Sequence, residues 1–321
     1  MKVAVTSKIP RVGIDVLEDA GLEVVGNPTE RLFTQSELKD FVKGADAIYC
    51  LILDKITRDI IEAAGPQLKI IANYGVGFDN IDVKAAQEKG VFVTNTPSER
   101  SGQAVAEHTL GLIFAVLKRI VEGDEFARKG NFGGWKPEIF LGEELSEKTV
   151  GLVGLGQIGM KVAAMLRGLG LRVIYNKRNR DEEAEKTYGI EYLSLENLLR
   201  EADIVSLHVP LTPETYHLIN SDSLAKMKNR AYLINTSRGG VVDEWALVEA
   251  LKSGKLAGAG LDVYEYEPAV NPELCGLPNV VLTPHIASSI RAVRDEMAIM
   301  AAKNIVAALK GQIPPNLIGA K

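Results

Sequence analysis

The sequence predicts two α/β domains, each built on a doubly wound parallel sheet, with a cleft between them. Short β-branched runs alternate with amphipathic helical patterns from one end of the chain to the other. At 321 residues, the chain allows roughly two domains of ~150 residues each. A glycine fingerprint typical of dinucleotide-binding folds begins only in the middle of the chain, so the residues before it need a domain of their own.

The first series of elements occupies about the first hundred residues. A helical pattern, VKAAQEKG, precedes its last strand, and a longer helical pattern covers roughly residues 100–129. A loop containing Gly, Trp and Pro then leads into the second series. The predicted strands of the first series are 3–6, 47–52, 69–74 and 91–95.

The second series follows the same alternation. Its helical pattern DEWALVEALKSG ends at a glycine suited to a helix C-cap. The final helix begins near residue 289 and could return to either domain. The predicted strands are 150–154, 172–176, 203–209, 231–236, 259–264 and 279–284.

Composition narrows the class of partner. A formal charge of −5 argues against bulk attraction to nucleic acid or to an anionic membrane, so a small molecule is favoured. Cys50 and Cys275 make neither a disulfide framework nor a metal cluster, and we expect no metal. The N-terminus has no apolar signal region, and the apolar run 112–117 is too short to span a bilayer. We therefore expect a cytoplasmic protein.

Gly154, Gly156 and Gly159 form a G-x-G-x-x-G fingerprint between a predicted strand and a predicted helix. The first glycine allows a tight turn, the second lets the backbone approach a pyrophosphate, and the third allows close helix–strand packing. The helix N-terminus offers free N–H groups to the anion. A lone fingerprint could be an ordinary tight turn, but this context favours a dinucleotide site.

The end of the next strand bears on the choice of cofactor. An acid about 20 residues beyond the glycines would bind the ribose 2′-hydroxyl of NAD. The sequence instead has Asn176, followed by Lys177, Arg178, Asn179 and Arg180. Arginine forks suit the extra phosphate of NADP, which favours NADP while NAD is possible. The alternative is a solvated turn followed by a charged helix start.

Three later segments carry a family resemblance. NTSRGGVVDE, AGLDVYEYEP and NVVLTPHIA resemble the D-isomer-specific 2-hydroxyacid dehydrogenase family, closest to its glyoxylate/hydroxypyruvate reductases, and the similarity covers essentially the whole chain. The resemblance implies that Arg238 binds the 2-oxo acid and that His285 donates a proton to its carbonyl oxygen. It also implies that Glu267 pairs with His285. Carbonyl reduction develops negative charge on oxygen, which an imidazolium both protonates and stabilises.

The resemblance also implies the domain roles. Residues 1–98 with 287–321 would form a flavodoxin-like substrate-binding domain, and residues 99–286 a Rossmann NAD(P)-binding domain. The turn amides of Val76 and Gly77 would bind the substrate carboxylate. Trp135 would reach the neighbouring subunit's pocket, or serve as an ordinary interface residue. Besides the glycines and residues 176–180, the implied cofactor contacts are Gln157, Ile158, His208, Pro210, Thr236, Ser237 and Asp262.

The expected activity is NADPH-dependent reduction of glyoxylate or hydroxypyruvate to a 2-hydroxy acid by a homodimer. One alternative is 2-ketogluconate reduction or another D-2-hydroxyacid dehydrogenase activity. A dinucleotide-sensing protein that resembles the related corepressors is another. Of the remaining histidines, His108 is expected to be structural or cofactor-lining, and His217 is expected in a helical stretch without a suggested partner.

Overall fold

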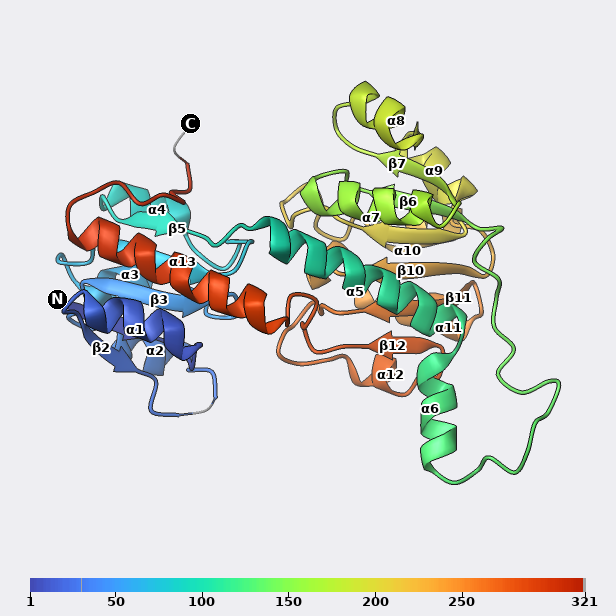
Figure 1. Cartoon of the computed structure of the whole chain (residues 1–321), viewed down its shortest axis with the longest axis horizontal. Helices are drawn as coiled ribbons and strands as arrows, with labels where there is room; N and C mark the ends of the chain where they lie inside the picture. The colour runs from blue at the N-terminus through green and yellow to red at the C-terminus, as the bar shows by residue number, and fades with distance from the viewer. Residues whose placement is uncertain (30, 320–321) are drawn as a thin grey trace. The chain divides into compact units, whose positions relative to one another are not determined.

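The computed structural model describes residues 1–29 and 31–319 and divides the chain into two compact units. The first unit comprises Met1–Ser101 and Ser289–Lys321, and the second comprises Gly102–Ser288. Each unit has its own sheet, of five and seven strands, and every strand pair in both sheets is parallel (Figure 1). The predicted class of two parallel-sheet α/β domains is confirmed.

The first unit has the strand order β2-β1-β3-β4-β5. The C-terminal helix α13 packs against α1, β3 and β4, so the end of the chain returns to the first sheet (Figure 1). The elements are β1 (Lys2–Val5), α1 (Arg11–Asp19), β2 (Glu23–Gly26), α2 (Gln35–Phe41), β3 (Ala47–Leu51), α3 (Arg58–Ala64), β4 (Ile70–Tyr74), α4 (Val83–Glu88), β5 (Phe92–Thr94) and α13 (Arg291–Leu309).

Small residues allow α13 to approach its neighbours closely. A Cβ added at Gly13 of α1 would lie only 2.9 Å from Cβ of Ala298. Two tyrosine hydroxyls of the sheet donate to carbonyls of α13, Tyr49 to Ala298 at 3.1 Å and Tyr74 to Arg294 at 2.8 Å. These contacts fix the helix on the sheet by packing and by hydrogen bonds together.

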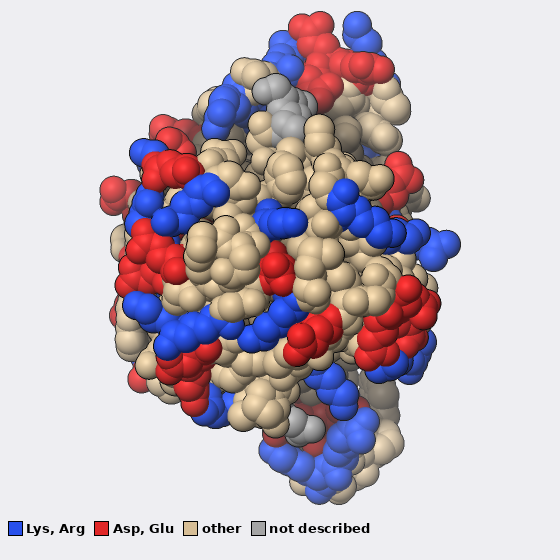
Figure 2. Space-filling view, turned by 90° about the vertical axis from the view of Figure 1, so that its left-hand side faces the viewer, with Lys and Arg blue, Asp and Glu red and all other residues tan. Residues whose placement is uncertain are grey.

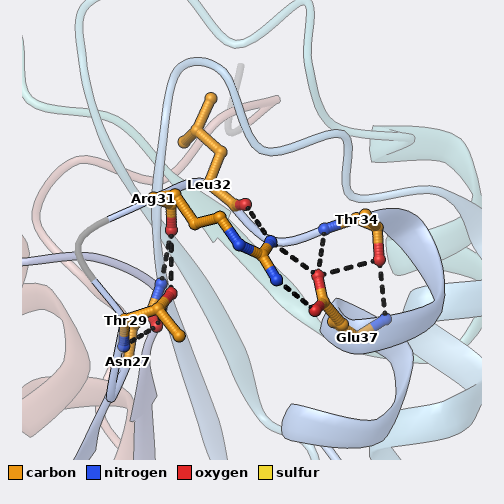
Figure 3. A network of polar contacts seen from close by, with 6 residues as sticks. All are labelled: Asn27, Thr29, Arg31, Leu32, Thr34 and Glu37. Carbon is orange, nitrogen blue, oxygen red and sulfur yellow. Dashed lines mark hydrogen bonds and ion pairs between the residues drawn. The ribbon is translucent and has the colours of Figure 1, made fainter.

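A polar network organises the loop between β2 and α2 (Figure 3). Thr34 caps α2 in a capping box with Glu37, whose side chain accepts from the Thr34 N–H at 2.8 Å. Both terminal nitrogens of Arg31 donate to the Glu37 carboxylate, and Asn27 Nδ2 donates to the Arg31 carbonyl at 3.0 Å. The Arg31 hydrogen bonds, followed by those from Thr34, lower the pKa of Glu37 to about 2.

The second unit has the strand order β12-β11-β10-β9-β6-β7-β8, so β6 and β9 are neighbours at the point where the chain changes direction across the sheet. The elements are α5 (Glu99–Leu117), most of which lies in this unit, α6 (Ile120–Arg128), β6 (Thr149–Val153), α7 (Gln157–Gly168), β7 (Arg172–Asn176), α8 (Glu182–Tyr188), β8 (Glu191–Tyr192), α9 (Leu195–Glu201), β9 (Ile204–Leu207), α10 (Ser221–Lys226), β10 (Ala231–Asn235), the short 3₁₀ turn Gly239–Val241, α11 (Glu244–Lys252), β11 (Leu256–Leu261), α12 (Pro272–Cys275) and β12 (Val280–Leu282).

Two apolar clusters pack against this sheet. One contains buried side chains of α5, α7 and α8, including Ile113, Val162 and Leu166. The other contains side chains of α9, α10 and α11, including Leu198 and Leu247. Burial on both sides explains why the strands read as continuous apolar runs in the sequence.

The single helix expected over residues 100–129 is wrong, because the structure breaks it in two. Arg119 adopts a left-handed φ of 53° between α5 and α6. The Leu117 carbonyl accepts from Glu143 N–H at 3.0 Å, so the incoming loop occupies an acceptor that a continuous helix would use. The Arg119 guanidinium bonds the Glu122 carboxylate through two nitrogens at 2.7 and 2.8 Å, which stabilises the start of α6.

The charges on the surface and the length of the helices give two further observations. On the face that Figure 2 shows, Lys and Arg lie interspersed with Asp and Glu, with uncharged residues between them. Such a face offers no single-sign field to a polyanion. Among the residues described, no helix is long and apolar enough to cross a membrane.

Candidate active site

The turn between β6 and α7 is built around two glycines without room for a side chain. Gly154 has a φ of +99°, and a Cβ there would lie 2.6 Å from the His208 carbonyl oxygen. A Cβ at Gly159 would lie 2.5 Å from the Gly154 carbonyl oxygen. The turn, the first turn of α7 and the end of β9 are therefore in close backbone contact, as the fingerprint predicts.

Gly156 is different, because a Cβ added there meets no atom within 4 Å. Gly156 is the N-cap of α7, a helix of 12 residues. Within the described part of the chain, the N–H groups of Gln157, Ile158 and Gly159 donate no hydrogen bond. Three free N–H groups and open space beside Gly156 fit the pyrophosphate of a dinucleotide.

The predicted cation cluster after β7 is partly occupied by the protein's own acids. Lys177 Nζ bonds Asp181 at 2.9 Å, and Arg180 bonds the Glu185 carboxylate through two nitrogens at 2.9 and 2.8 Å. The Tyr175 hydroxyl also donates to Glu185, at 2.8 Å. Two of the three cations therefore already have partners within the loop and α8.

Arg178 differs from its neighbours. It is exposed, and it makes no hydrogen bond or ion pair with another residue in the described ranges. The pKa of Glu214, in the loop after β9, is lowered chiefly by hydrogen bonding to Thr212 and further by the charge of Arg178. The charge of Arg178 therefore acts on a residue of the loop that follows β9.

His285 and Glu267 form the pair that the sequence predicts. Nδ1 of His285 lies 2.8 Å from Oε2 of Glu267. An ionised carboxylate can only accept a hydrogen bond, so Nδ1 carries the proton of this contact. Nε2 is the ring nitrogen that does not face Glu267. The second oxygen of Glu267 accepts from the Tyr264 N–H at 3.0 Å, which fixes the carboxylate on its own loop.

Asp262 determines where His285 lies. Its side chain is buried and accepts from Thr283 Oγ1 at 2.6 Å and from the main-chain N–H of Ile286 and Ala287 at 2.8 and 2.9 Å. His285 itself has a left-handed φ of 52° within this clamped segment. Burial raises the pKa of Asp262, but hydrogen bonds from His108, Thr283 and the two amides outweigh it and lower the pKa overall.

Arg238 follows β10 beside the same loop. Its carbonyl accepts from Asn235 Nδ2 at 2.9 Å, and Asn235 Oδ1 accepts from Ser237 N–H at 3.0 Å. A Cβ at Gly239 would lie 1.8 Å from the Tyr264 carbonyl carbon, so only glycine allows this approach. The Arg238–Gly239 backbone is thus pressed against the segment that ends in Glu267.

Sequence reasoning missed a second histidine–carboxylate pair. His217 Nε2 lies 2.8 Å from Glu265 Oε1, and the Tyr216 hydroxyl donates to the same oxygen at 3.1 Å. The helical stretch expected for His217 is wrong, since the residue lies in a turn with a φ of 49°. The only sequence signal for this pair is Glu265 itself, an acid two residues before Glu267.

The remaining predicted residues lie in several places. Val76 and Gly77 form the turn after β4 in the first unit. Trp135 lies in the loop between α6 and β6 and is 84% exposed. Thr236 is buried and its hydroxyl lies 2.9 Å from that of Thr109. Nε2 of His208 lies 2.9 Å from the Ser206 hydroxyl, and burial lowers the pKa of His208 to about 4. Asn176 ends β7, Asn179 lies in the loop after it, and Pro210 lies in the loop after β9.

The described residues bear on two kinds of site, a metal site and a dinucleotide site. Over residues 1–29 and 31–319, no group of three or more His, Cys, Asp or Glu side chains could bind a metal ion. The free amides of α7 follow β6, Glu267 follows β11 and His285 follows β12. These strands belong to one parallel sheet whose order is that of dinucleotide-binding folds. The fold and the free amides define an α/β protein of the dinucleotide-binding class.

The comparisons with known proteins give the family. A family model described as "D-isomer specific 2-hydroxyacid dehydrogenase, NAD binding domain" matches residues 110–287. The chain is 48% identical to a glyoxylate reductase of Thermococcus litoralis over 99% of this chain and 96% of that protein. It is 46% identical to a glyoxylate reductase of Pyrococcus horikoshii over 99% of this chain and 95% of that protein. The chain belongs to the D-isomer-specific 2-hydroxyacid dehydrogenase family and is an oxidoreductase that acts on CH–OH donors.

Solved structures agree. A glyoxylate reductase from Paecilomyes thermophila superposes with a TM-score of 0.86 at 32% identity, over 99% of this chain and 98% of that chain. An NADPH-dependent glyoxylate/hydroxypyruvate reductase from Sinorhizobium meliloti, solved with NADP and malonate, superposes with a TM-score of 0.85 at 32% identity, over 99% of this chain and 96% of that chain. These relatives share the fold of this chain, and their names support the reduction of 2-oxo acids as its reaction class.

Proposed function

We propose that this protein is an NADPH-dependent reductase of small 2-oxo acids, with glyoxylate and hydroxypyruvate as the first substrates to test. The observation that carries the proposal is the 2.8 Å contact between His285 Nδ1 and Glu267 Oε2 beside the Arg238–Gly239 backbone. A proton donor and a cation that binds carboxylates are what carbonyl reduction of a 2-oxo acid needs. The relatives named glyoxylate reductase support the choice of substrate.

In this mechanism, His285 holds the proton to be transferred on Nε2, because Nδ1 is bonded to Glu267. Nε2 of His285 would donate this proton to the carbonyl oxygen as negative charge develops there. Arg238 binds the substrate carboxylate and stays charged at any working pH. By the same proposal, the N–H groups of Val76 and Gly77 also bind this carboxylate.

The cofactor would bind at the free amides of Gln157 and Ile158, next to Gly156. When bound, it supplies the hydride, and the hydride chemistry is its own. Of the cations after β7, we assign the 2′-phosphate of NADP chiefly to Arg178, because Lys177 and Arg180 are already paired with acids. Asn176, Asn179, His208, Pro210, Thr236, Ser237 and Asp262 complete the proposed cofactor site.

The proposal includes a homodimer in a cytoplasmic setting. The loop between α6 and β6 exposes Phe132, Trp135 and Leu141 by 70%, 84% and 66%. Large exposed apolar side chains clustered on one segment favour a protein interface. Trp135 would then contact the partner's substrate pocket.

The test is steady-state turnover, measured as kcat/KM for glyoxylate and hydroxypyruvate with NADPH and with NADH. We expect turnover of at least one of the two acids, faster with NADPH. An NADH preference would leave the reductase in place and remove the phosphate role from Arg178. Tight cofactor binding with negligible turnover of any 2-oxo acid, 2-ketogluconate included, would overturn the proposal in favour of a dinucleotide sensor.

A further inference from the structure

The turn that follows β4 has its carbonyl groups bonded to the protein one after another. The Gly75 carbonyl accepts from the Thr96 main-chain N–H at 2.9 Å. The Val76 carbonyl accepts from Asn95 Nδ2 at 2.6 Å. The two donors are the first and second residues after β5, so the segment that leaves one strand fixes the turn that leaves its neighbour.

The next carbonyl, that of Gly77, accepts from Asn73 Nδ2 at 2.7 Å. Asn73 is fully buried in β4, and its Oδ1 accepts from Asn80 Nδ2 at 3.2 Å. Asn80 Nδ2 also lies 3.0 Å from the carbonyls of Leu51 and Asp54. The asparagine that bonds Gly77 is therefore itself held on both sides and cannot easily rotate.

Peptide planarity converts these three bonds into an orientation for three N–H groups. In a trans peptide, the C=O of one residue and the N–H of the next point in opposite directions. Bonding the carbonyls of residues 75–77 toward β5 and Asn73 therefore turns the N–H groups of Val76, Gly77 and Phe78 the other way. Within the ranges described, none of these three N–H groups donates a hydrogen bond.

We infer that Asn95 and Asn73 are positioning residues for substrate binding, because their amides orient the N–H groups that bind the substrate carboxylate. This inference rests on the proposed function, which assigns the carboxylate to this turn. It adds that the binding strength is determined by side chains that do not touch the substrate. Successive free N–H groups in a turn can form an anion-binding concavity, and such a site should lose affinity when any one of its peptides is free to rotate.

The inference predicts an effect on substrate binding rather than on the chemical step. A carboxylate is bound equally in the ground state and the transition state, so weakening its binding raises KM and leaves kcat nearly unchanged. One lost neutral hydrogen bond corresponds to a change of about 3- to 10-fold. We expect Asn95→Ala to raise KM for glyoxylate by that factor at constant kcat.

The main variant is Asn95→Ala, because Asn95 is only half-buried and its loss removes one donor from a formed turn. Asn95→Gln keeps an amide donor and should recover part of the lost affinity. Asn95→Asp removes the donor and adds a negative charge, so it should bind substrate more weakly than Asn95→Ala. Asn73→Ser changes the buried asparagine and, if the variant folds, it should also raise KM at constant kcat.

Asn27→Ala is the matched control. Asn27 Nδ2 also donates to main-chain carbonyls in the first unit, those of Thr6 and Arg31 at 2.9 and 3.0 Å. The control should lower the melting temperature at least as much as Asn95→Ala does, because the Asn27 side chain also accepts from Thr29, and it should leave KM unchanged. A KM increase shared by both variants would reduce the effect to general loss of stability and overturn the inference.

A second readout separates this inference from the proposed function. Oxamate, a carboxylate that cannot accept a hydride, is titrated into the NADPH-loaded protein, and its Kd is measured for wild type and variants. Weaker oxamate binding in Asn95→Ala than in wild type supports the inference even if wild type reduces no oxo acid. Unchanged KM and unchanged oxamate Kd overturn the inference while leaving the reductase intact. Oxamate that fails to bind wild type overturns both.

Discussion

The turn after β4 in the first unit and the turn after β6 in the second both contain glycines and free N–H groups, but they are held differently. The β6 turn depends on absent side chains, because a Cβ at Gly154 or Gly159 would lie 2.6 or 2.5 Å from a main-chain oxygen that cannot yield. In the β4 turn, the tight neighbour of Gly75 is a side-chain methyl of Ile52, at 2.1 Å from the position that a Cβ would take.

The β4 turn is held instead by donors, chiefly the amides of Asn73 and Asn95. Backbone-on-backbone packing fixes the position of a turn, and that suits a large cofactor that must be approached closely. Hydrogen bonds to carbonyls fix the orientation of individual peptides, and that suits a small anion bound by a few N–H groups. The comparison predicts different failures when each turn is disturbed.

The largest expected effect lies in neither turn but at the proton donor of the second unit. His285→Ala should reduce kcat by about 10²- to 10⁴-fold, since it removes general acid catalysis. The affinity for NADPH should change little, because the cofactor is assigned to the glycine turn. Stopped-flow turnover and fluorescence titration of NADPH measure the two quantities.

His217→Ala is the matched control for that variant. His217 also forms a 2.8 Å pair with a glutamate, Glu265, and we assign it no part in the reaction. Its turnover should stay within a few-fold of wild type. Near-normal turnover of His285→Ala would remove the chemistry from this pair altogether.

The next largest effect separates two glycines of one turn. Gly159→Ala places a Cβ 2.5 Å from the Gly154 carbonyl oxygen, and such overpacking should lower the free energy of unfolding by about 2 kcal/mol. Gly156→Ala meets no atom within 4 Å, so the loss there should be under about 1 kcal/mol, with weaker NADPH binding as the main defect. Urea unfolding and cofactor titration of both variants provide the measurement. Equal destabilisation by the two substitutions would contradict the close-packing account of the β6 turn.

A smaller effect should distinguish the two arginines after β7. Arg178→Gln should lower the ratio of kcat/KM with NADPH to that with NADH by about 10-fold or more, because a charge-assisted contact to phosphate is lost. Arg180→Gln should change the ratio by less than about 3-fold, since Arg180 already bonds Glu185. Equal losses with both cofactors, or a larger loss at Arg180, would contradict the assignment to Arg178.

The smallest effect concerns the network around Glu37 in the first unit. The folded pKa of Glu37, about 2, lies below the unfolded value of about 4.3. The carboxylate therefore stabilises the fold fully above about pH 4.3, and this contribution is lost as the pH falls through about 2. Glu37→Gln should lower the melting temperature slightly at pH 7 and by less at pH 3.

Glu185→Gln makes the equivalent change in the second unit, where hydrogen bonding to Arg180 chiefly lowers the pKa of Glu185 to about 2. It should show the same convergence with wild type at low pH. Exposed pairs contribute little, so scanning calorimetry with both variants side by side is the suitable measurement. A difference from wild type that grows as the pH falls would have the wrong sign for a lowered carboxyl pKa.

Much of the second unit could be predicted from the sequence because its determinants are local. Short motifs in the sequence indicate its main features. They are the Gly154–Gly159 spacing, the apolar strands and the order of Arg238, Glu267 and His285. The edge strand β2 escaped prediction because its four residues, EVVG, are only partly buried and read as part of a loop. The break between α5 and α6 escaped it because the Leu117 carbonyl finds its partner in Glu143, far along the chain.

The cation cluster shows a different limit. Residues 177–180 read as three available cations, but acids four and five positions further on, Asp181 and Glu185, bond two of them. Those acids were visible in the sequence, and only the geometry shows which cation each one takes. Likewise, the motif indicates a glycine turn at Val76–Gly77, but the bonds from Asn73 and Asn95 depend on the register of β4 and β5.

The free N–H groups of Val76, Gly77 and Phe78 also allow ligand binding at this turn to be followed by hydrogen–deuterium exchange. Amides without a hydrogen-bond partner exchange with solvent deuterium quickly, even where the backbone is rigid, while the strand amides on either side exchange slowly. Val76 and Phe78 are each 40% exposed, so solvent reaches them directly. A ligand carboxylate bound to these amides would slow their exchange at three consecutive positions, so the deuterium uptake of one short peptide would record occupancy of the turn without any turnover.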